Sequence, residues 1–240
     1  MTPVVFVHGF LGGSRQWQGQ IKALAEHDVL AVDLPGFGSN AHLEPLASIP
    51  AYAAWVLETA TAHGLAQFHL VGHSMGGMIA QDMAHQAPDK VQDLVLYGTG
   101  ATGVLPGRFE TIETSMARSE SDGAQATARR IAATWFLHTT QADAYETCVA
   151  IAEQARLAAI LAGLDAMRMW DGVDRLGAIK ARTLLIWGDR DRTYQWSQIQ
   201  QLWTLIPSAR LAVLPDCAHA AHLEKPHMFD ALLRDFLSRG

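Results

Sequence analysis

A serine, an aspartate and a histidine occur along this chain in an order that would support nucleophilic catalysis. Ser74 stands in "LVGHSMGGMIAQ" (residues 70–81), Asp191 in "WGDRDRTY" and His219 in "CAHAAHLEKP". A serine hydroxyl is a weak nucleophile unless a nearby base takes its proton, and a histidine oriented by a carboxylate can serve as that base. If the fold brings them together, these residue types predict attack on a carbonyl group.

The surroundings of Ser74 fit the G-x-S-x-G pattern of a nucleophile elbow. Glycines at 72 and 76 would let a strand and the following helix approach closely, while the serine is held in a strained turn between them. The start of that helix also directs N–H groups and its positive dipole end toward the serine. The alternative is an ordinary glycine-rich turn. The position between a strand-like and a helix-like run favours the nucleophile.

His219 is the candidate base, because it follows the last predicted strand and would loop over the serine. We expect His222, at the start of the final helix, to cap or pack, and His73 to point away across the tight turn. A zinc site made of His219, His222 and Glu224 is an alternative, but no further ligand cluster supports it. We therefore expect no metal and no cofactor.

Two aspartates compete for the role of the acid that orients the histidine. Asp189 directly follows the glycine at the strand end and would serve equally well to cap the turn. Asp191 lies further along the loop, toward the strand end that carries His219. An orienting acid must be buried and reach the imidazole ring from a loop, so we favour Asp191.

Acyl attack also requires backbone donors for the oxyanion. Met75 follows the serine directly, and its N–H is one expected donor. The loop "HGFLGG" after the first strand makes the N–H of Phe10 the other. A simple glycine turn is the alternative explanation of this loop.

These residues must be positioned by a sheet whose strands are buried on both faces. The apolar runs are mostly unbroken, which is typical of parallel strands covered by helices, and strand and helix signals alternate. Strands are predicted at Val4–His8, Val29–Asp33, Phe68–Gly72, Val91–Gly98, Thr183–Gly188 and Arg210–Leu214, with helices near 14–26, 48–64, 75–87, 195–205 and 226–238. This pattern predicts a doubly wound, mostly parallel α/β sheet of about six strands. Serine, acid and histidine fall at its carboxyl ends, where such sheets place active sites.

The alternation stops between residues 101 and 178, which predicts a helical insertion into a core formed by residues 1–100 and 179–240. Helix-period stretches lie at Phe109–Arg118, Gln125–His138 and Asp143–Met169. An insertion of this length is far longer than a typical loop and predicts a function. Apolar side chains of the insertion would line a substrate pocket or pack its helices onto the core; Trp135, Phe136 and Met116 are the pocket candidates. Arg129 and Arg130 would bind a carboxylate or form a solvated helix face.

Composition limits the partners. The net charge is −6, without a dense Lys/Arg run, which disfavours nucleic acid. The two cysteines form no disulfide framework, and no apolar stretch is long enough to span a bilayer. The first residues lack a basic region and suit a core strand better than a signal peptide. We expect a cytoplasmic protein that binds a small-molecule substrate and does not insert into membranes; a homodimer is left open.

Outside the insertion the sequence resembles the α/β-hydrolase fold superfamily, in its serine-nucleophile branch. The motifs that carry the resemblance are "HGFLGG", "DLPGFGSN", "GHSMGG", "WGDRD" and "HAAHLEKP". The resemblance implies that the acid is the last residue of Gly188–Asp191, that His219 is the histidine and that the insertion is a cap over the active site. Members of the superfamily usually have two further strands before the His-Gly strand. This chain begins almost on that strand, so a sheet of six is expected.

Within the superfamily, the chain is similar to small esterases, enol-lactone hydrolases and carbon–carbon bond hydrolases. It is also similar to the menaquinone-pathway enzyme that eliminates pyruvate, although Met78 stands near the position of an arginine in that enzyme. We expect a cofactor-free serine hydrolase of a small, fairly apolar ester, thioester or lactone. Carbon–carbon bond hydrolysis or elimination by the same three residues is one alternative, and a non-catalytic binding or signalling protein is another.

Overall fold

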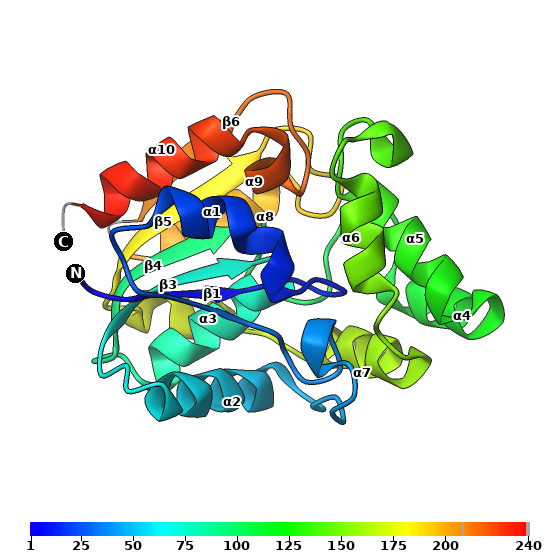
Figure 1. Ribbon diagram of the computed structural model, residues 1–240, viewed down its shortest axis with the longest axis horizontal. Helices are drawn as coiled ribbons and strands as arrows, with labels where there is room; N and C mark the ends of the chain where they lie inside the picture. Colours follow the sequence, from blue (N-terminus) through cyan, green and yellow to red (C-terminus); the bar gives the residue numbers. More distant parts are fainter. Residues whose placement is uncertain (208, 239–240) are drawn as a thin grey trace.

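A six-stranded parallel sheet forms the centre of the molecule in a computed structural model, which describes residues 1–207 and 209–238 (Figure 1). The strands lie in the order β2-β1-β3-β4-β5-β6, and all neighbouring pairs are parallel. Their bounds are β1 Val4–Val7, β2 Val29–Val32, β3 Phe68–His73, β4 Val91–Tyr97, β5 Arg182–Gly188 and β6 Arg210–Leu214. The predicted α/β sheet of six strands is confirmed, and each strand lies within two residues of its expected bounds.

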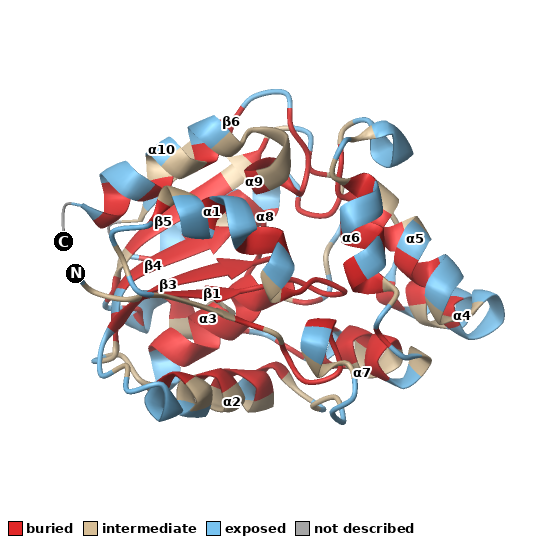
Figure 2. Ribbon diagram, viewed as in Figure 1, coloured by how far each residue is buried: buried red, intermediate tan, exposed pale blue. Residues whose placement is uncertain are grey.

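The unbroken apolar runs are explained by burial on both faces of the sheet. Along β1, Val5 and Val7 belong to one hydrophobic cluster, whereas Val4 and Phe6 belong to another. Successive side chains of a strand point to opposite faces, so helices on both sides require apolar residues at every position. Figure 2 shows the four inner strands, β1, β3, β4 and β5, almost entirely buried between exposed helix surfaces, whereas the edge strands β2 and β6 are only partly buried.

Helices cover the two faces in separate groups. Buried residues of α2 (Ile49–Ala62), α3 (Met75–Gln86) and α8 (Trp196–Leu205) join the first cluster. Buried residues of α9 (Ala221–Glu224) and α10 (Pro226–Leu237) join the second, and α1 (Gln18–Ala23) packs against α10. Short 3₁₀ turns lie at Ser14–Trp17, Gly38–Asn40, Thr139–Gln141 and Val173–Ala178.

Four further helices lie between β4 and β5 in the chain and form a separate group beside the carboxyl ends of the strands (Figure 1). They are α4 (Ile112–Asp122), α5 (Ala124–Thr134), α6 (Tyr145–Ala152) and α7 (Leu157–Arg168), and α4 packs against both α5 and α7. Two short segments lead into and out of this group side by side: Gly172 donates to the Ala101 carbonyl and Gly103 to that of Trp170. The division into core and cap stays a prediction.

The sequence predicted one continuous helical stretch over Asp143–Met169, whereas α6 and α7 are separate and meet at 99°. Arg156 is extended at the break, and its side chain donates a hydrogen bond to the carbonyl of Leu43, in the segment between β2 and α2. The bend lets both helices bury apolar residues, Val149 on α6 and Ile160 on α7 among them. Within the described residues, no single helix is long and apolar enough to cross a membrane. Only α6 and α7 counted together, as a bent pair, meet that length and composition.

Candidate active site

Ser74 occupies a strained turn between β3 and α3. Its φ of 56° and ψ of −119° lie in a region that non-glycine residues rarely adopt. The surrounding backbone enforces this conformation, because the Ser74 N–H donates to the Tyr97 carbonyl of β4 and the Ser74 carbonyl accepts from Thr99 Oγ1. The turn presents a serine at the carboxyl end of the central strands.

Glycines are required around this serine by close backbone contacts. A Cβ on Gly76 would lie 2.3 Å from the Val7 carbonyl oxygen, and one on Gly72 would lie 2.3 Å from the carbonyl oxygen of Gly76. On the other side, a Cβ on Gly9 would lie 2.9 Å from the Cβ of Ser74. The loop after β1 therefore passes directly beside the serine, which explains why both sequence motifs are rich in glycine.

His219 and Asp191 form a buried pair. Nδ1 of His219 lies 2.8 Å from Oδ2 of Asp191, and the two side chains are 3% and 0% exposed. The other carboxylate oxygen of Asp191 accepts the N–H groups of Thr193 and Tyr194 at 2.7 and 3.2 Å. With Nδ1 donating to the carboxylate, Nε2 is the nitrogen left to accept a proton. Among the described residues, no direct hydrogen bond joins the Ser74 hydroxyl to this ring; such contacts often tighten only when substrate binds.

The geometry favours Asp191 over Asp189 as the partner of His219. Oδ2 of Asp189 lies 3.8 Å from Nε of Arg190, and no hydrogen bond to His219 is found for its carboxylate among the described residues. Gly98, which follows β4 with a φ of +49°, leaves room for the pair: a Cβ there would lie 3.2 Å from Nδ1 of His219.

Three aromatic and imidazole rings support His219 from behind. The Tyr97 hydroxyl donates to the His219 carbonyl at 2.5 Å, and the His73 ring stacks on Tyr97 with centroids 4.4 Å apart. His222 packs on Trp17, and burial, followed by the neighbouring His219, lowers its pKa to about 3. Neutral rings at these positions hold the backbone of His219 without adding charge next to its imidazole ring.

The zinc alternative has no geometric support. His219 faces Asp191, Nδ1 of His222 lies 3.2 Å from the Tyr97 hydroxyl, and Glu224 accepts the N–H groups of Leu137 and Ala218. Within the part of the chain that the structure describes, no three His, Cys, Asp or Glu side chains form a group that could hold a metal ion.

The two predicted oxyanion donors, the N–H groups of Phe10 and Met75, are near the serine and unoccupied. Neither donates a hydrogen bond to an acceptor in residues 1–207 or 209–238, although Phe10 is 7% exposed and Met75 fully buried. Buried N–H groups are rarely left without acceptors, so this pair is suited to receive an oxygen from a bound molecule.

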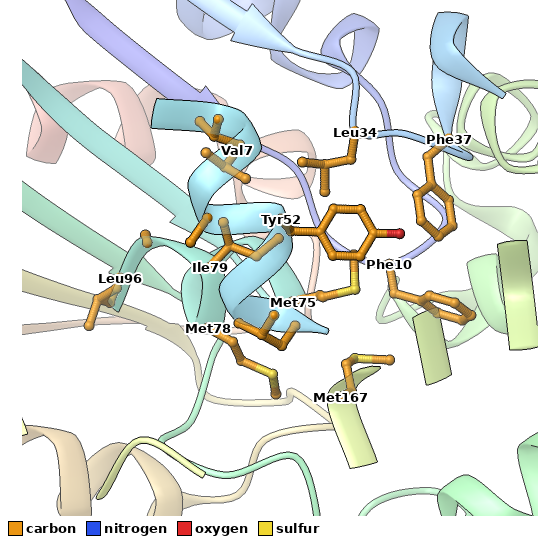
Figure 3. Close-up of a cluster of buried hydrophobic side chains, with 14 of the residues drawn as sticks. Val7, Phe10, Leu34, Phe37, Tyr52, Met75, Met78, Ile79, Leu96 and Met167 are labelled. Carbon is orange, nitrogen blue, oxygen red and sulfur yellow. The ribbon is translucent and has the colours of Figure 1, made fainter. Parts of the chain in front are cut away.

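Ser74 and His219 line a cavity together with mostly apolar side chains, and both also line a smaller one of about 10 Å³ beside Gly9 and Gln16. Its lining is Phe10, Ser74, Met78, Gly103, Leu105, Arg108, Phe109, Ile112, Ile131, Trp135, Met167, Thr193, Tyr194 and His219. Phe10, Met78 and Met167 are continuous with the core cluster drawn in Figure 3. The free volume is about 30 Å³, so the cavity is small.

The predicted pocket residues divide among three places. Trp135 lines the cavity with Ser74, whereas Phe136 lines a second cavity of about 270 Å³ beside Glu224. Met116 packs against the core cluster and is not part of the lining around Ser74. Arg129, on an exposed face, pairs with Glu153 at 2.7 Å, and Arg130 pairs with Glu110.

Sequence reasoning missed three polar residues of the cavity, Arg108, Thr193 and Tyr194. Tyr194 stacks on His219 at 5.6 Å, and burial raises the pKa of its phenol to about 12, while hydrogen-bond interactions with Ser74 and Thr99 act in the opposite direction. The N–H groups of Thr193 and Tyr194 both donate to the Asp191 carboxylate. An aspartate often accepts hydrogen bonds from the backbone two or three residues further on, so Asp191 could have predicted this turn and with it the position of Tyr194. Arg108 had no such local signal, because it follows β4 in a segment without helix or strand.

Residues 4–232 match the sequence model of the alpha/beta hydrolase family. The chain is 29% identical to 2-succinyl-6-hydroxy-2,4-cyclohexadiene-1-carboxylate synthase of Enterobacter sp. strain 638, over 98% of this chain and 91% of that protein. It is 31% identical to a protein of Variovorax paradoxus strain S110 named as a carbamate hydrolase, over 98% and 91% of the two chains. The chain is 28% identical to the pimeloyl-[acyl-carrier protein] methyl ester esterase of Aeromonas hydrophila, over 98% of this chain and 94% of that protein.

Solved structures share the fold. The enol-lactonase from Burkholderia xenovorans LB400 superposes with a TM-score of 0.88 over 99% of this chain and 92% of that chain, at 23% identity. The six-stranded sheet with helices inserted after β4 is thus an arrangement that this chain has in common with a protein of quite different sequence.

Proposed function

Because this chain is an enzyme of the alpha/beta hydrolase family, we propose that it is a serine hydrolase of a small, fairly apolar carboxylic ester, thioester or lactone. Ser74 is the nucleophile, His219 the general base and Asp191 the acid that orients the imidazole. The N–H groups of Phe10 and Met75 receive the oxyanion. The observation that carries the proposal is the buried His219–Asp191 pair at the edge of a cavity that also contains Ser74.

The proposed reaction has two stages. The Ser74 oxygen forms a bond to the substrate carbonyl carbon as Nε2 of His219 takes the hydroxyl proton, and the imidazolium is stabilised by Asp191. The tetrahedral intermediate then expels the alcohol, or thiol, which takes that proton from His219. In the second stage His219 removes a proton from water, whose oxygen attacks the acyl carbon; the new tetrahedral intermediate expels the Ser74 oxygen, which takes the proton back from His219 as the carboxylic acid leaves.

The apolar lining supports the substrate class. Leu105, Phe109, Ile131 and Met167 provide hydrophobic surface beside the serine, which favours an acyl or leaving group with little polarity along its length. The Aeromonas relative named as a methyl ester esterase makes ester hydrolysis the first reaction to test.

A second candidate is elimination or carbon–carbon bond cleavage by the same three residues, with an enolate in place of the tetrahedral intermediate. The similarity to a protein named as a cyclohexadiene carboxylate synthase favours testing it. Met78, which lines the cavity beside Ser74, carries no charge near the position where that enzyme has an arginine.

The proposal is tested with a panel of p-nitrophenyl esters, thioesters, lactones and vinylogous diketones. We expect the purified protein to hydrolyse the esters in preference to the diketones. Ser74→Ala should lower kcat on the best ester by on the order of 10⁶-fold, because the three residues act as a unit. Ser121→Ala, an exposed serine on α4, is the matched control and should retain wild-type activity. Turnover of the esters by Ser74→Ala at the wild-type rate would refute the assignment.

A further inference from the structure

Arg108 is the residue of the Ser74 cavity that the proposed hydrolytic reaction leaves without a role. Of the fourteen residues that line the cavity, it is the only one with a permanently charged side chain, and none of the fourteen carries a carboxylate. Apart from the catalytic residues and two hydroxyl side chains, its neighbours in the lining are apolar. A cation therefore faces a cavity that contains no counter-ion.

The contacts of Arg108 hold its position but do not neutralise its charge. Nη1 donates to the Glu110 carbonyl at 2.6 Å and to Ser115 Oγ at 3.1 Å, both uncharged acceptors. The guanidinium carbon lies 4.4 Å from the centre of the Phe109 ring. Within the described residues, Nε and Nη2 have no hydrogen-bond acceptor and no carboxylate lies within ion-pair distance of the side chain. Two donors of the guanidinium fork are thus available.

Glu110, the nearest acidic residue in sequence, is already occupied. Its Oε1 accepts from Ser115 Oγ at 2.5 Å and from Arg130, and its Oε2 lies 3.2 Å from Nη1 of Arg118. Arg130 Nε and Nη2 are themselves buried without partners among the described residues. The Glu110 carboxylate thus pairs with two arginines other than Arg108, and one of these, Arg118, also lies 3.9 Å from Asp122.

We propose that Arg108 binds a carboxylate of the substrate, so that the enzyme prefers esters with an acidic group separated from the scissile carbonyl by an apolar spacer. The proposal rests on the proposed function, since it assigns the substrate class of the same cavity. Arginine is suited to this role because its planar fork can donate two parallel hydrogen bonds to a carboxylate. Partial burial strengthens such a bond by reducing competition from water, and burial also lowers the pKa of Arg108, with Tyr194 and Glu110 acting in the opposite direction.

The test uses two matched pairs of substrates, one with the carboxylate on the acyl side of the scissile bond and one with it on the alcohol side. On the acyl side, mono-p-nitrophenyl adipate is compared with its methyl ester. On the alcohol side, 4-acetoxybenzoate is compared with methyl 4-acetoxybenzoate. We expect wild-type kcat/KM to favour the acid of at least one pair. Arg108→Gln should lower kcat/KM for that acid by about 10- to 100-fold, the range for a hydrogen bond to a charged group, and change the neutral partner less than about 3-fold.

Two further variants separate binding from structure. Arg108→Lys keeps the charge but not the fork, so it should retain part of the preference for the acid. Arg129→Gln removes an exposed arginine of α5 and should leave kcat/KM unchanged for both members of each pair. The proposal would be overturned if wild-type kcat/KM were the same for the acid and the ester in both pairs. It would also be overturned if Arg108→Gln lowered kcat/KM equally for the acid and the ester of a pair.

A binding measurement distinguishes this proposal from the proposed function. Calorimetry of monomethyl adipate and 4-acetoxybenzoate on Ser74→Ala, with and without Arg108→Gln, needs no turnover. If the hydrolytic assignment is wrong but Arg108 binds carboxylates, the wild type will not hydrolyse the esters and binding will still depend on Arg108. If the carboxylate site is wrong, the esters will be hydrolysed and binding will be unaffected by Arg108→Gln.

Discussion

At the scale of the residue, the site depends on one carboxylate whose two oxygens have separate tasks. Oδ2 of Asp191 accepts from His219, and Oδ1 accepts the N–H groups of Thr193 and Tyr194. The loop that carries the acid is therefore folded around its own side chain. Tyr194 then places its ring parallel to the imidazole, at an interplanar angle of 18°. A single aspartate fixes both the tautomer of the proposed base and the position of a cavity residue.

Replacing this aspartate tests its proposed role against that of its neighbour. Asp191→Asn should lower kcat on an ester by on the order of 10⁴-fold, because an amide can stabilise the wrong imidazole tautomer and cannot stabilise the imidazolium. Asp189→Asn, two residues away and 32% exposed at its side chain, should stay within a few-fold of wild type. Steady-state kinetics on both purified variants provides the measurement. A comparable loss in the two variants would contradict the assignment of Asp191.

At the scale of the element, the sequence predicted the sheet better than the inserted helices. Strands buried on both faces give continuous apolar runs, so β1 to β6 were located within two residues of their bounds. The break between α6 and α7 was missed because "AEQARL" contains neither glycine nor proline, and the hydrogen bond from Arg156 to the distant Leu43 carbonyl leaves no local signal in the sequence. Local motifs in the sequence predict Ser74, His219 and Asp191 as site residues. Tertiary packing, which no local motif reports, decides that Arg108 lines the cavity with Ser74 and that Phe136 lines another one.

The contact between α3 and β1 should tolerate no side chain at position 76. Because a Cβ on Gly76 would lie 2.3 Å from a backbone oxygen of β1, helix and strand must separate in Gly76→Ala. We expect a loss of about 1–3 kcal/mol in the free energy of unfolding. The shift would also displace the adjacent Met75 N–H and lower kcat.

Gly19→Ala is the matched control, since Gly19 lies within α1 and a Cβ there meets nothing within 4 Å. It should raise the free energy of unfolding by up to about 1 kcal/mol through helix propensity. Urea unfolding of both variants measures the difference. Equal stability of Gly76→Ala and wild type would show that the close approach of α3 and β1 is not obligatory.

At the scale of the whole molecule, buried neutral histidines link stability to pH. His8, His73 and His222 are buried, and burial lowers the pKa of each below its ordinary value. His8 is held neutral by its contacts as well, since its Nε2 accepts the N–H of Leu34. In the unfolded chain these rings take up protons near pH 6.5, whereas in the folded protein they resist protonation.

Because the pKa values of these three histidines are lower in the folded protein than in the unfolded chain, the unfolded state binds more protons as the pH falls. Their contribution to the free energy of unfolding is therefore fully present above about pH 6.5 and is lost as the pH falls below it. Each ring contributes a slope of up to about 1.4 kcal/mol per pH unit, so the three together give up to about 4 kcal/mol per unit. Urea unfolding at pH 7, 6 and 5 measures it. A free energy of unfolding that does not change over this range would contradict the buried neutral state of these histidines.

The most direct test of the account is covalent labelling of the proposed nucleophile by a fluorophosphonate, with the modified peptide located by mass spectrometry. Activation of a hydroxyl by the buried imidazole predicts one adduct per chain, on the peptide that contains Ser74, and a labelling rate that falls sharply in His219→Ala. An enzyme that hydrolyses esters while this peptide stays unmodified, or one that is labelled at another serine, would show that the chemistry takes place elsewhere.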